Sequence, residues 1–125
     1  KWTVVCIDTL GYQSVLRNGV RTWGWKGQLA SGGIVTVPLT SGDLDAWELR
    51  AAASKIDGTA REYLHAFGGH GGQTVLTDST ANTESVNAPG TAGKLTWLKD
   101  TLQVKNNLAY TADVFIDITW KSPME

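Results

Sequence analysis

The sequence predicts a mainly β protein, an antiparallel meander sheet of successive hairpins, with a β-sandwich as the alternative arrangement. Two observations support this fold class. Strand-like segments with apolar residues at every second position recur along the chain, and turn dipeptides such as Asn-Gly and Asp-Gly separate them. The class becomes α+β if helices follow the sheet or pack on it.

The composition predicts a single domain over residues 1–125. This length is enough for an ordinary core, and 42% hydrophobic residues with a net charge of −1 describe a soluble globular chain. No apolar run is long enough for a transmembrane helix, and we expect no signal peptide. The near-neutral charge argues against nucleic-acid binding through phosphate contacts alone, but it allows a focused basic surface. Cys6 is the only cysteine, so no intrachain disulfide is expected.

Four strands are expected in the first third of the chain. They cover Trp2–Thr9, Tyr12–Arg17, Val20–Lys26 and Ile34–Leu39. Asn18-Gly19 is a hairpin-type turn between the second and the third of them. Trp23 and Trp25 are two positions apart and should share a strand face, unless Gly24 forms a bulge.

The stretch Ala46–Phe67 is the strongest hairpin signal, because Asp57-Gly58 lies between two arms of similar length. In the first arm, one side carries Trp47, Leu49, Ala51 and Ala53, and the other carries Glu48, Arg50, Ala52 and Ser54. In the return arm, one side carries Arg61, Tyr63, His65 and Phe67, and the other carries Glu62, Leu64 and Ala66. This period of two predicts a strand pair with one buried face and one face that can bind a partner.

A helix over Ser41–Lys55 is the local alternative to the first arm of this hairpin. Ser41 would cap that helix, and the alanines favour it intrinsically. Leu44, Trp47 and Ala51 would then form an apolar stripe along one side. The sequence therefore leaves strand and helix open here, with the hairpin preferred.

A long exposed loop is expected after the hairpin. Residues Thr77–Gly93 are almost entirely Thr, Ser, Asn, Ala, Gly and Pro, and the glycine run Gly68–Gly72 and the short apolar piece Thr74–Leu76 precede them. Little in Thr77–Gly93 can be buried, so we expect no strand there.

The last third of the chain returns to strand character. Lys94–Val104 is expected to be a strand, Lys105–Asn107 a turn, and Ala109–Lys121 the clearest strand of all. Its apolar residues Ala112, Val114, Ile116, Ile118 and Trp120 alternate with Thr111, Asp113, Phe115, Asp117, Thr119 and Lys121. Ser122–Glu125 matches the signature of a helix start.

No catalytic motif is present in the sequence, so we expect no enzyme, no catalytic residue, no metal and no cofactor. His65 and His70 lie five residues apart, and a metal site there would need further ligands, for which only Asp57 or Asp78 is a candidate. One packed and one loop histidine are therefore expected. Asp113 and Asp117 share a strand face and are expected to be solvated carboxylates.

The six tryptophans divide into two groups. Trp2, Trp47 and Trp120 alternate with core residues and are expected to pack. Trp23, Trp25 and Trp97 could be core residues, interface residues or platforms for sugars or bases, and the core is the default.

The hairpin and the last strand together carry a family resemblance. Ala46-Trp47 and Arg61-Glu62-Tyr63 at their observed separation, then Ala109-Tyr110 through Trp120 and the capped Ser122–Glu125, resemble the coat proteins of small single-stranded RNA bacteriophages, the levivirus type. The opening WTVVCID and the stretch GGIVTV fall in fitting places. The connection Gly68–Gly93 is longer than its counterpart in that family.

This resemblance implies an RNA-phage-coat-like sheet, a homodimer with a continuous sheet, and an icosahedral shell of many dimers around RNA. It places the protein in the virion, assembled in the host cytoplasm, with other copies of itself and single-stranded RNA as partners and no membrane. By position, it implies RNA binding on the inner sheet face through Arg50, Ser54 and Tyr110. A guanidinium for phosphate and a ring for a base are the groups that such contacts need. The alternative for Tyr110 is an aromatic that fills the sheet surface.

A second resemblance is to fungal fruit-body lectins. Thr40-Ser41-Gly42 and Phe67–Asp78 are similar to the sugar-contacting loops of that family, with His70 in the place of its loop histidine. It implies, as the alternative function, a carbohydrate-binding β-sandwich. Gly71-Gly72 replace the asparagine and aromatic residues that make the main sugar contacts in the family.

Overall fold

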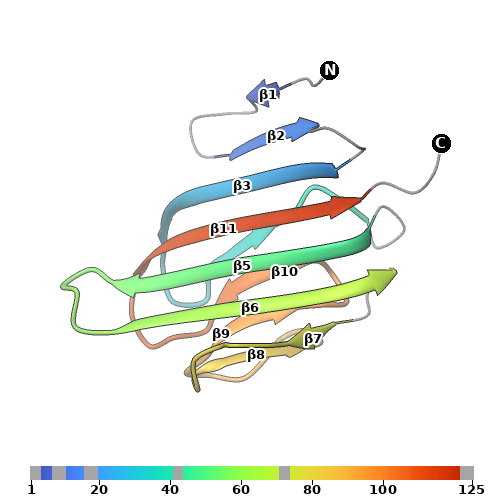
Figure 1. The fold of residues 1–125 in the computed structure, drawn as a ribbon. Helices are drawn as coiled ribbons and strands as arrows, with labels where there is room; N and C mark the ends of the chain where they lie inside the picture. The colour runs from blue at the N-terminus through green and yellow to red at the C-terminus, as the bar shows by residue number, and fades with distance from the viewer. Residues whose placement is uncertain (1–3, 7–10, 16–19, 41–43, 71–73, 122–125) are drawn as a thin grey trace.

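Two β-sheets packed in two layers form the described part of the molecule, which is seen here in a computed structural model (Figure 1). The structure describes residues 4–6, 11–15, 20–40, 44–70 and 74–121. Every regular element in these ranges is a strand. Within the same ranges, no helix is long and apolar enough to cross a membrane. The expectation of a mainly β protein is confirmed.

The larger sheet has seven strands in the order β1-β2-β3-β11-β5-β6-β7, and all neighbours are antiparallel. Its strands are β1 (Val4–Cys6), β2 (Gly11–Val15), β3 (Val20–Leu29), β5 (Asp45–Lys55), β6 (Arg61–His70), β7 (Val75–Leu76) and β11 (Ala112–Lys121). The last strand of the chain lies between β3 and β5, so it joins the hairpins of the first half into one sheet (Figure 1).

The smaller sheet has four strands in the order β4-β10-β9-β8 and lies behind the larger one (Figure 1). Its strands are β4 (Ile34–Thr36), β8 (Thr83–Val86), β9 (Leu95–Leu98) and β10 (Gln103–Asn106). Only the pair β8–β9 within it is parallel. A parallel pair needs a crossover connection rather than a tight turn, and residues 87–94 supply it.

The core forms between the inner faces of the two sheets. The larger sheet contributes alternate residues of its central strands, including Ile116, Ile118 and Trp47, and the smaller sheet contributes Trp97 and Val104. The rings of Trp47 and Trp97 meet across the layers, with centroids 5.9 Å apart and planes tilted by 47°. Such a tilted aromatic contact adds to the free energy gained from burying both rings.

The central hairpin is confirmed, and the helical alternative is wrong over its described residues 44–55. Gly58 has φ +78°, a conformation that favours glycine, and its amide donates to the carbonyl of Lys55 at 2.8 Å. The Asp57 carboxylate accepts from the amide and the hydroxyl of Thr59 at 2.9 and 2.6 Å, and these bonds lower the pKa of Asp57. The two arms pair from Asp45 with His70 to Ser54 with Arg61.

Three expectations for the second half of the chain are wrong. The segment Thr77–Gly93 is not one long exposed loop, because it contains β8, where Thr83 and Glu84 are buried. Lys94–Val104 is not one strand but two, β9 and β10, with a turn between them. Lys105–Asn107 is not simply a turn, because Asn106 is the buried last residue of β10. Its side-chain amide donates to the carbonyls of Leu29 and Tyr110 at 2.8 and 3.0 Å. Polar residues are buried in this region because hydrogen bonds satisfy them.

The tryptophan predictions hold wherever the structure describes the residue. Trp47, Trp120, Trp23 and Trp97 are buried, and Trp25 packs partly buried against the core on the same strand face as Trp23. No bulge occurs at Gly24, since the pairing of β3 with β11 runs through it without a shift. Trp2, the turn Asn18-Gly19 and the helix start at Ser122–Glu125 lie outside the described residues.

The contact between Trp47 and Trp97 leads to a prediction about stability. Trp97→Ala should lower the free energy of unfolding by about 3–5 kcal/mol, because it opens a cavity where the layers meet. Trp97→Phe should cost less than half as much, since the ring is retained and Nε1 of Trp97 has no hydrogen-bond partner among the described residues. Urea titration of both variants measures this, and equal losses would contradict it.

Candidate functional site on the outer face of the larger sheet

The outer face of the larger sheet is the candidate site. We define it by the side chains that alternate with core residues on the four central strands and so point away from the smaller sheet. They are Thr22, Lys26 and Gln28 on β3, Asp113, Phe115, Asp117 and Thr119 on β11, Glu48, Arg50, Ala52 and Ser54 on β5, and Arg61, Tyr63, His65 and Phe67 on β6. Strand periodicity places them on one side of each strand, and the pairing register brings these sides to one surface.

Three large aromatic side chains are exposed on this outer face. Phe115 is 49% exposed, Phe67 43% and Tyr63 42%. Val75 of β7, which pairs with Phe67, is 54% exposed and extends the apolar surface to the edge of the sheet. Exposed apolar groups that gather on one face indicate a surface that contacts a ligand or a partner.

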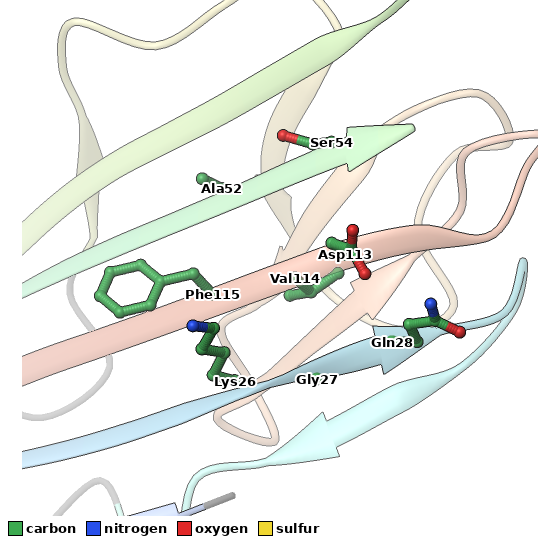
Figure 2. A pocket seen from close by; sticks show the side chains of 8 residues that line it. All are labelled: Lys26, Gly27, Gln28, Ala52, Ser54, Asp113, Val114 and Phe115. Carbon is green, nitrogen blue, oxygen red and sulfur yellow. The ribbon is translucent and has the colours of Figure 1, made fainter. Parts of the chain in front are cut away.

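Two open hollows flank Phe115. The first has a volume of about 430 Å³, and Figure 2 shows its lining side chains on three neighbouring strands. Lys26 and Gln28 come from β3, Asp113 and Phe115 from β11, and Ala52 and Ser54 from β5. An ammonium, an amide, a carboxylate and a hydroxyl therefore line this hollow together with an exposed aromatic residue.

The second hollow, of about 290 Å³, lies between Phe115 and Tyr63. Ala52 stands directly opposite Phe115 on one side and Tyr63 on the other, so a methyl group separates two aromatic side chains in one row across the sheet. Arg50, His65 and Asp78 complete the rim. We call this hollow the aromatic gap.

The carboxylate of Glu48 holds the two basic groups at the rim of the aromatic gap. Its Oε1 lies 3.1 Å from Nη2 of Arg50, and its Oε2 lies 2.8 Å from Nε2 of His65. The side chains of Arg50 and Glu48 are 55% and 39% exposed, and ion pairs this exposed contribute little to stability. They orient the guanidinium and the imidazole instead.

The structure brings two of the three predicted RNA-binding residues to this face. Arg50 lies at the rim of the aromatic gap, and Ser54 lines the first hollow. Tyr110 is not with them, because it packs against the core and the ammonium of Lys55 lies 5.5 Å from its ring centroid. Burial, and next to it the charge of Glu62, raises the pKa of Tyr110.

Sequence reasoning missed Phe115 and Tyr63 as site residues, although a signal for Phe115 existed. In the strand Ala109–Lys121, Phe115 is the only large apolar residue among the positions that alternate with the core. An aromatic residue at a polar position of an amphipathic strand is expected to be exposed. That Ala52 and Tyr63 stand beside it depends on strand pairing, which the sequence does not reveal.

The two histidines and the two β11 aspartates considered as candidate site residues do not form one cluster. His65 lies on the outer face, and His70 is the exposed last residue of β6. Asp113 and Asp117 lie on either side of Phe115 along β11, and Asp117 accepts a hydrogen bond from the hydroxyl of Thr22 at 3.3 Å. In the part of the chain that the structure describes, no group of three or more His, Cys, Asp or Glu could hold a metal ion.

No known protein family, curated protein or solved structure matches this chain. The site is therefore interpreted from its own geometry. The outer face offers exposed rings, hydrogen-bonding groups of both charges and two hollows, which together suit recognition of a ligand or a partner surface.

A second polar cluster surrounds Glu84 on the smaller sheet. Glu84 is 8% exposed, and its Oε2 accepts from the amide of Thr91 at 2.6 Å and from the hydroxyl of Thr96 at 2.9 Å. Burial acts to raise the pKa of Glu84, but these hydrogen bonds and the charge of Lys94 outweigh it and hold the pKa below its ordinary value. The carboxylate ties the crossover between β8 and β9 to the sheet, which is a structural role.

This lowered pKa predicts acid sensitivity. A carboxyl group whose pKa is lower in the folded than in the unfolded state stabilises the fold above its ordinary pKa of 4.5, and this stabilisation is lost as the pH falls through the folded-state value. Glu84→Gln should lower the free energy of unfolding by about 1–2 kcal/mol at pH 7 and flatten its decline below pH 4.5. Urea titrations from pH 7 to roughly pH 3 test this, and parallel curves for the two proteins would contradict it.

Proposed function

We propose that this chain is a non-enzymatic structural subunit, a coat protein that dimerises and assembles into an icosahedral shell, with the outer face in contact with single-stranded RNA. The observation that carries this proposal is the open outer face with three exposed aromatic side chains, Tyr63, Phe67 and Phe115. A surface of this kind is stable in water but gains free energy when a partner covers it.

The chemistry of the outer face fits a local contact with RNA. Lys26, Arg50 and Arg61 supply cations for phosphate groups, and the exposed rings supply stacking surfaces for bases. Acidic residues stand among these cations, and the net charge of the chain is −1. Binding must therefore depend on rings and hydrogen bonds more than on a long-range basic field.

The edges of the larger sheet restrict how copies could join. On the β6 side, the segment 77–80 already bonds to the strand, since the amides of Thr77 and Thr80 donate to the carbonyls of His65 and Tyr63 at 2.8 and 3.0 Å. The edge strand on that side is the two-residue β7, which offers few backbone groups to another strand. We therefore place a continuous-sheet dimer at the opposite, β1 side.

Assembly is tested by size-exclusion chromatography and electron microscopy of the purified protein. We expect closed particles that contain nucleic acid, recognised by their absorbance at about 260 nm. Phe115→Ser should reduce the RNA content of the particles. The matched control Ile56→Ser should not, because Ile56 is 52% exposed but lies in the turn of the hairpin. A discrete monomer without particles would contradict the proposal.

A second candidate function, carbohydrate binding, is favoured by the first hollow. A ring beside a carboxylate, an amide, a hydroxyl and an ammonium can stack on the C–H face of a sugar and bond its hydroxyls, and Phe115, Asp113, Gln28, Ser54 and Lys26 offer these groups. This site is distinct from the loop around His70 that the lectin resemblance indicates. Residues 71–73 of that loop lie outside the described residues, as do Ser41-Gly42 of the other segment that carries the lectin resemblance.

A glycan array separates the two possible sugar sites. If the hollow binds sugar, Asp113→Asn should lose the signal by about tenfold or more, because a carboxylate that accepts two hydroxyl bonds is replaced. His70→Ala should keep the signal, because His70 is far from the hollow. Ser54, which lines the hollow, pairs with Arg61 at the start of β6, whereas His70 is the last residue of that strand. A blank array with the unmodified protein would end this candidate.

A further inference from the structure

We propose that the aromatic gap holds one base of single-stranded RNA between Phe115 and Tyr63, with the neighbouring phosphate at Arg50 and His65. This inference rests on the proposed RNA contact and specifies where and how that contact is made. It names residues that the family resemblance does not, since Phe115, Tyr63 and His65 are new and Tyr110 is absent from the site.

The spacing of the strands leaves room for one flat ring in the aromatic gap. Phe115 and Tyr63 lie in one row on β11 and β6, with Ala52 of β5 directly opposite each of them. Neighbouring strands are about 4.8 Å apart, so the backbones of β11 and β6 are separated by roughly 10 Å. A planar ring in van der Waals contact on both faces needs about 7–8 Å. The methyl group of Ala52 leaves this space open, and a longer side chain there would fill it.

The rim of the aromatic gap has the groups that a nucleotide requires. The Arg50 side chain is 55% exposed, and it can donate to a phosphate through the guanidinium N–H groups that Glu48 does not occupy. His65 stands opposite Arg50 on β6, and because its Nε2 already contacts Oε2 of Glu48 at 2.8 Å, Nδ1 is the ring nitrogen left for the nucleotide. Asp78, also on the rim, can accept from an exocyclic amine of the base.

These rim groups favour RNA over an aromatic side chain from another protein copy. An apolar side chain would fill the gap but would bring no anion to the exposed guanidinium of Arg50, whereas a nucleotide places an anion beside its flat ring. Stacking accepts every base, so the site binds a single strand with little sequence preference. Glu48 competes with the phosphate for Arg50, since its Oε1 lies 3.1 Å from Nη2, and it therefore weakens binding.

The test is a fluorescence-anisotropy titration of the purified protein with labelled oligoadenylate RNA. The second probe is an abasic ribose-phosphate oligomer of the same length. Phe115→Leu and Tyr63→Leu, which keep bulk but remove the ring, should each weaken oligoadenylate binding by about tenfold or more. Phe67→Leu, on the same face but outside the gap, should weaken binding clearly less than either. Ile34→Ala is the unaffected control, because Ile34 is 46% exposed but lies on β4 of the smaller sheet, and it should stay within about twofold. The abasic oligomer should bind weakly and equally to all variants.

Glu48→Gln gives a readout that a purely structural role would not produce. It releases the Arg50 guanidinium, so we expect tighter RNA binding and a steeper dependence of affinity on salt concentration. Unchanged or weaker binding by this variant would count against the phosphate site.

The outcomes separate this inference from the proposed function. Equal losses with Phe115→Leu and Phe67→Leu, or abasic RNA bound as tightly as oligoadenylate, would overturn the base site and leave the RNA contact standing. Particles that form without any RNA affinity would overturn the base site but support assembly. If the protein forms no particles and binds no RNA, both the base site and the proposed coat function are overturned. A dimer that dissociates in Phe115→Leu, without RNA binding, would assign the gap to a second copy of the chain.

Discussion

The register of β11 between β3 and β5 is the constraint on which both the core and the outer face depend. β11 pairs along its whole length with β3, from Ala112 with Leu29 to Lys121 with Val20, and along most of it with β5. Because side chains alternate between faces, the same register that turns Ile116 into the core turns Phe115 outward. A slip of one residue would exchange the two sets and expose the apolar side of the strand. The stability of the core and the composition of the outer face therefore both depend on the register of β11.

The second sheet decides which surface is left for partners. Its inner face covers the apolar side of the larger sheet, with Trp97 against Trp47 in the centre of the contact. The chain thus closes its own core on that side, and the outer face of the larger sheet remains open. Glu84 and Asn106 hold the connections of the smaller sheet through buried hydrogen bonds, which explains why polar segments can belong to it.

The outer face combines exposed rings with charges of both signs. Glu48 neutralises part of the charge of Arg50, and the aspartates on β11 stand among the cations of β3 and β5. A surface with this balance attracts nucleic acid weakly from a distance, so rings and close hydrogen bonds must supply the selectivity. The same balance suits contact with a second copy of the chain, which the proposed coat function also requires. The proposed base site depends on the small side chain of Ala52, because it opens the space between two aromatic residues.

The sequence by itself determined the strand class, the central hairpin and the direction of most side chains. Turn residues such as Gly58 and the period of two are local properties of the sequence. The exposure of Phe115 can be predicted in the same way, because it is an aromatic residue at a position of the strand where the other residues are polar. Only the tertiary structure decided that β11 lies between β3 and β5, that β8 arises within a polar segment, and that Tyr110 packs against the core. It also decided that Ala52 separates Phe115 from Tyr63. These features come from pairing between segments far apart in the chain, where burial and hydrogen bonding with distant partners outweigh local preference.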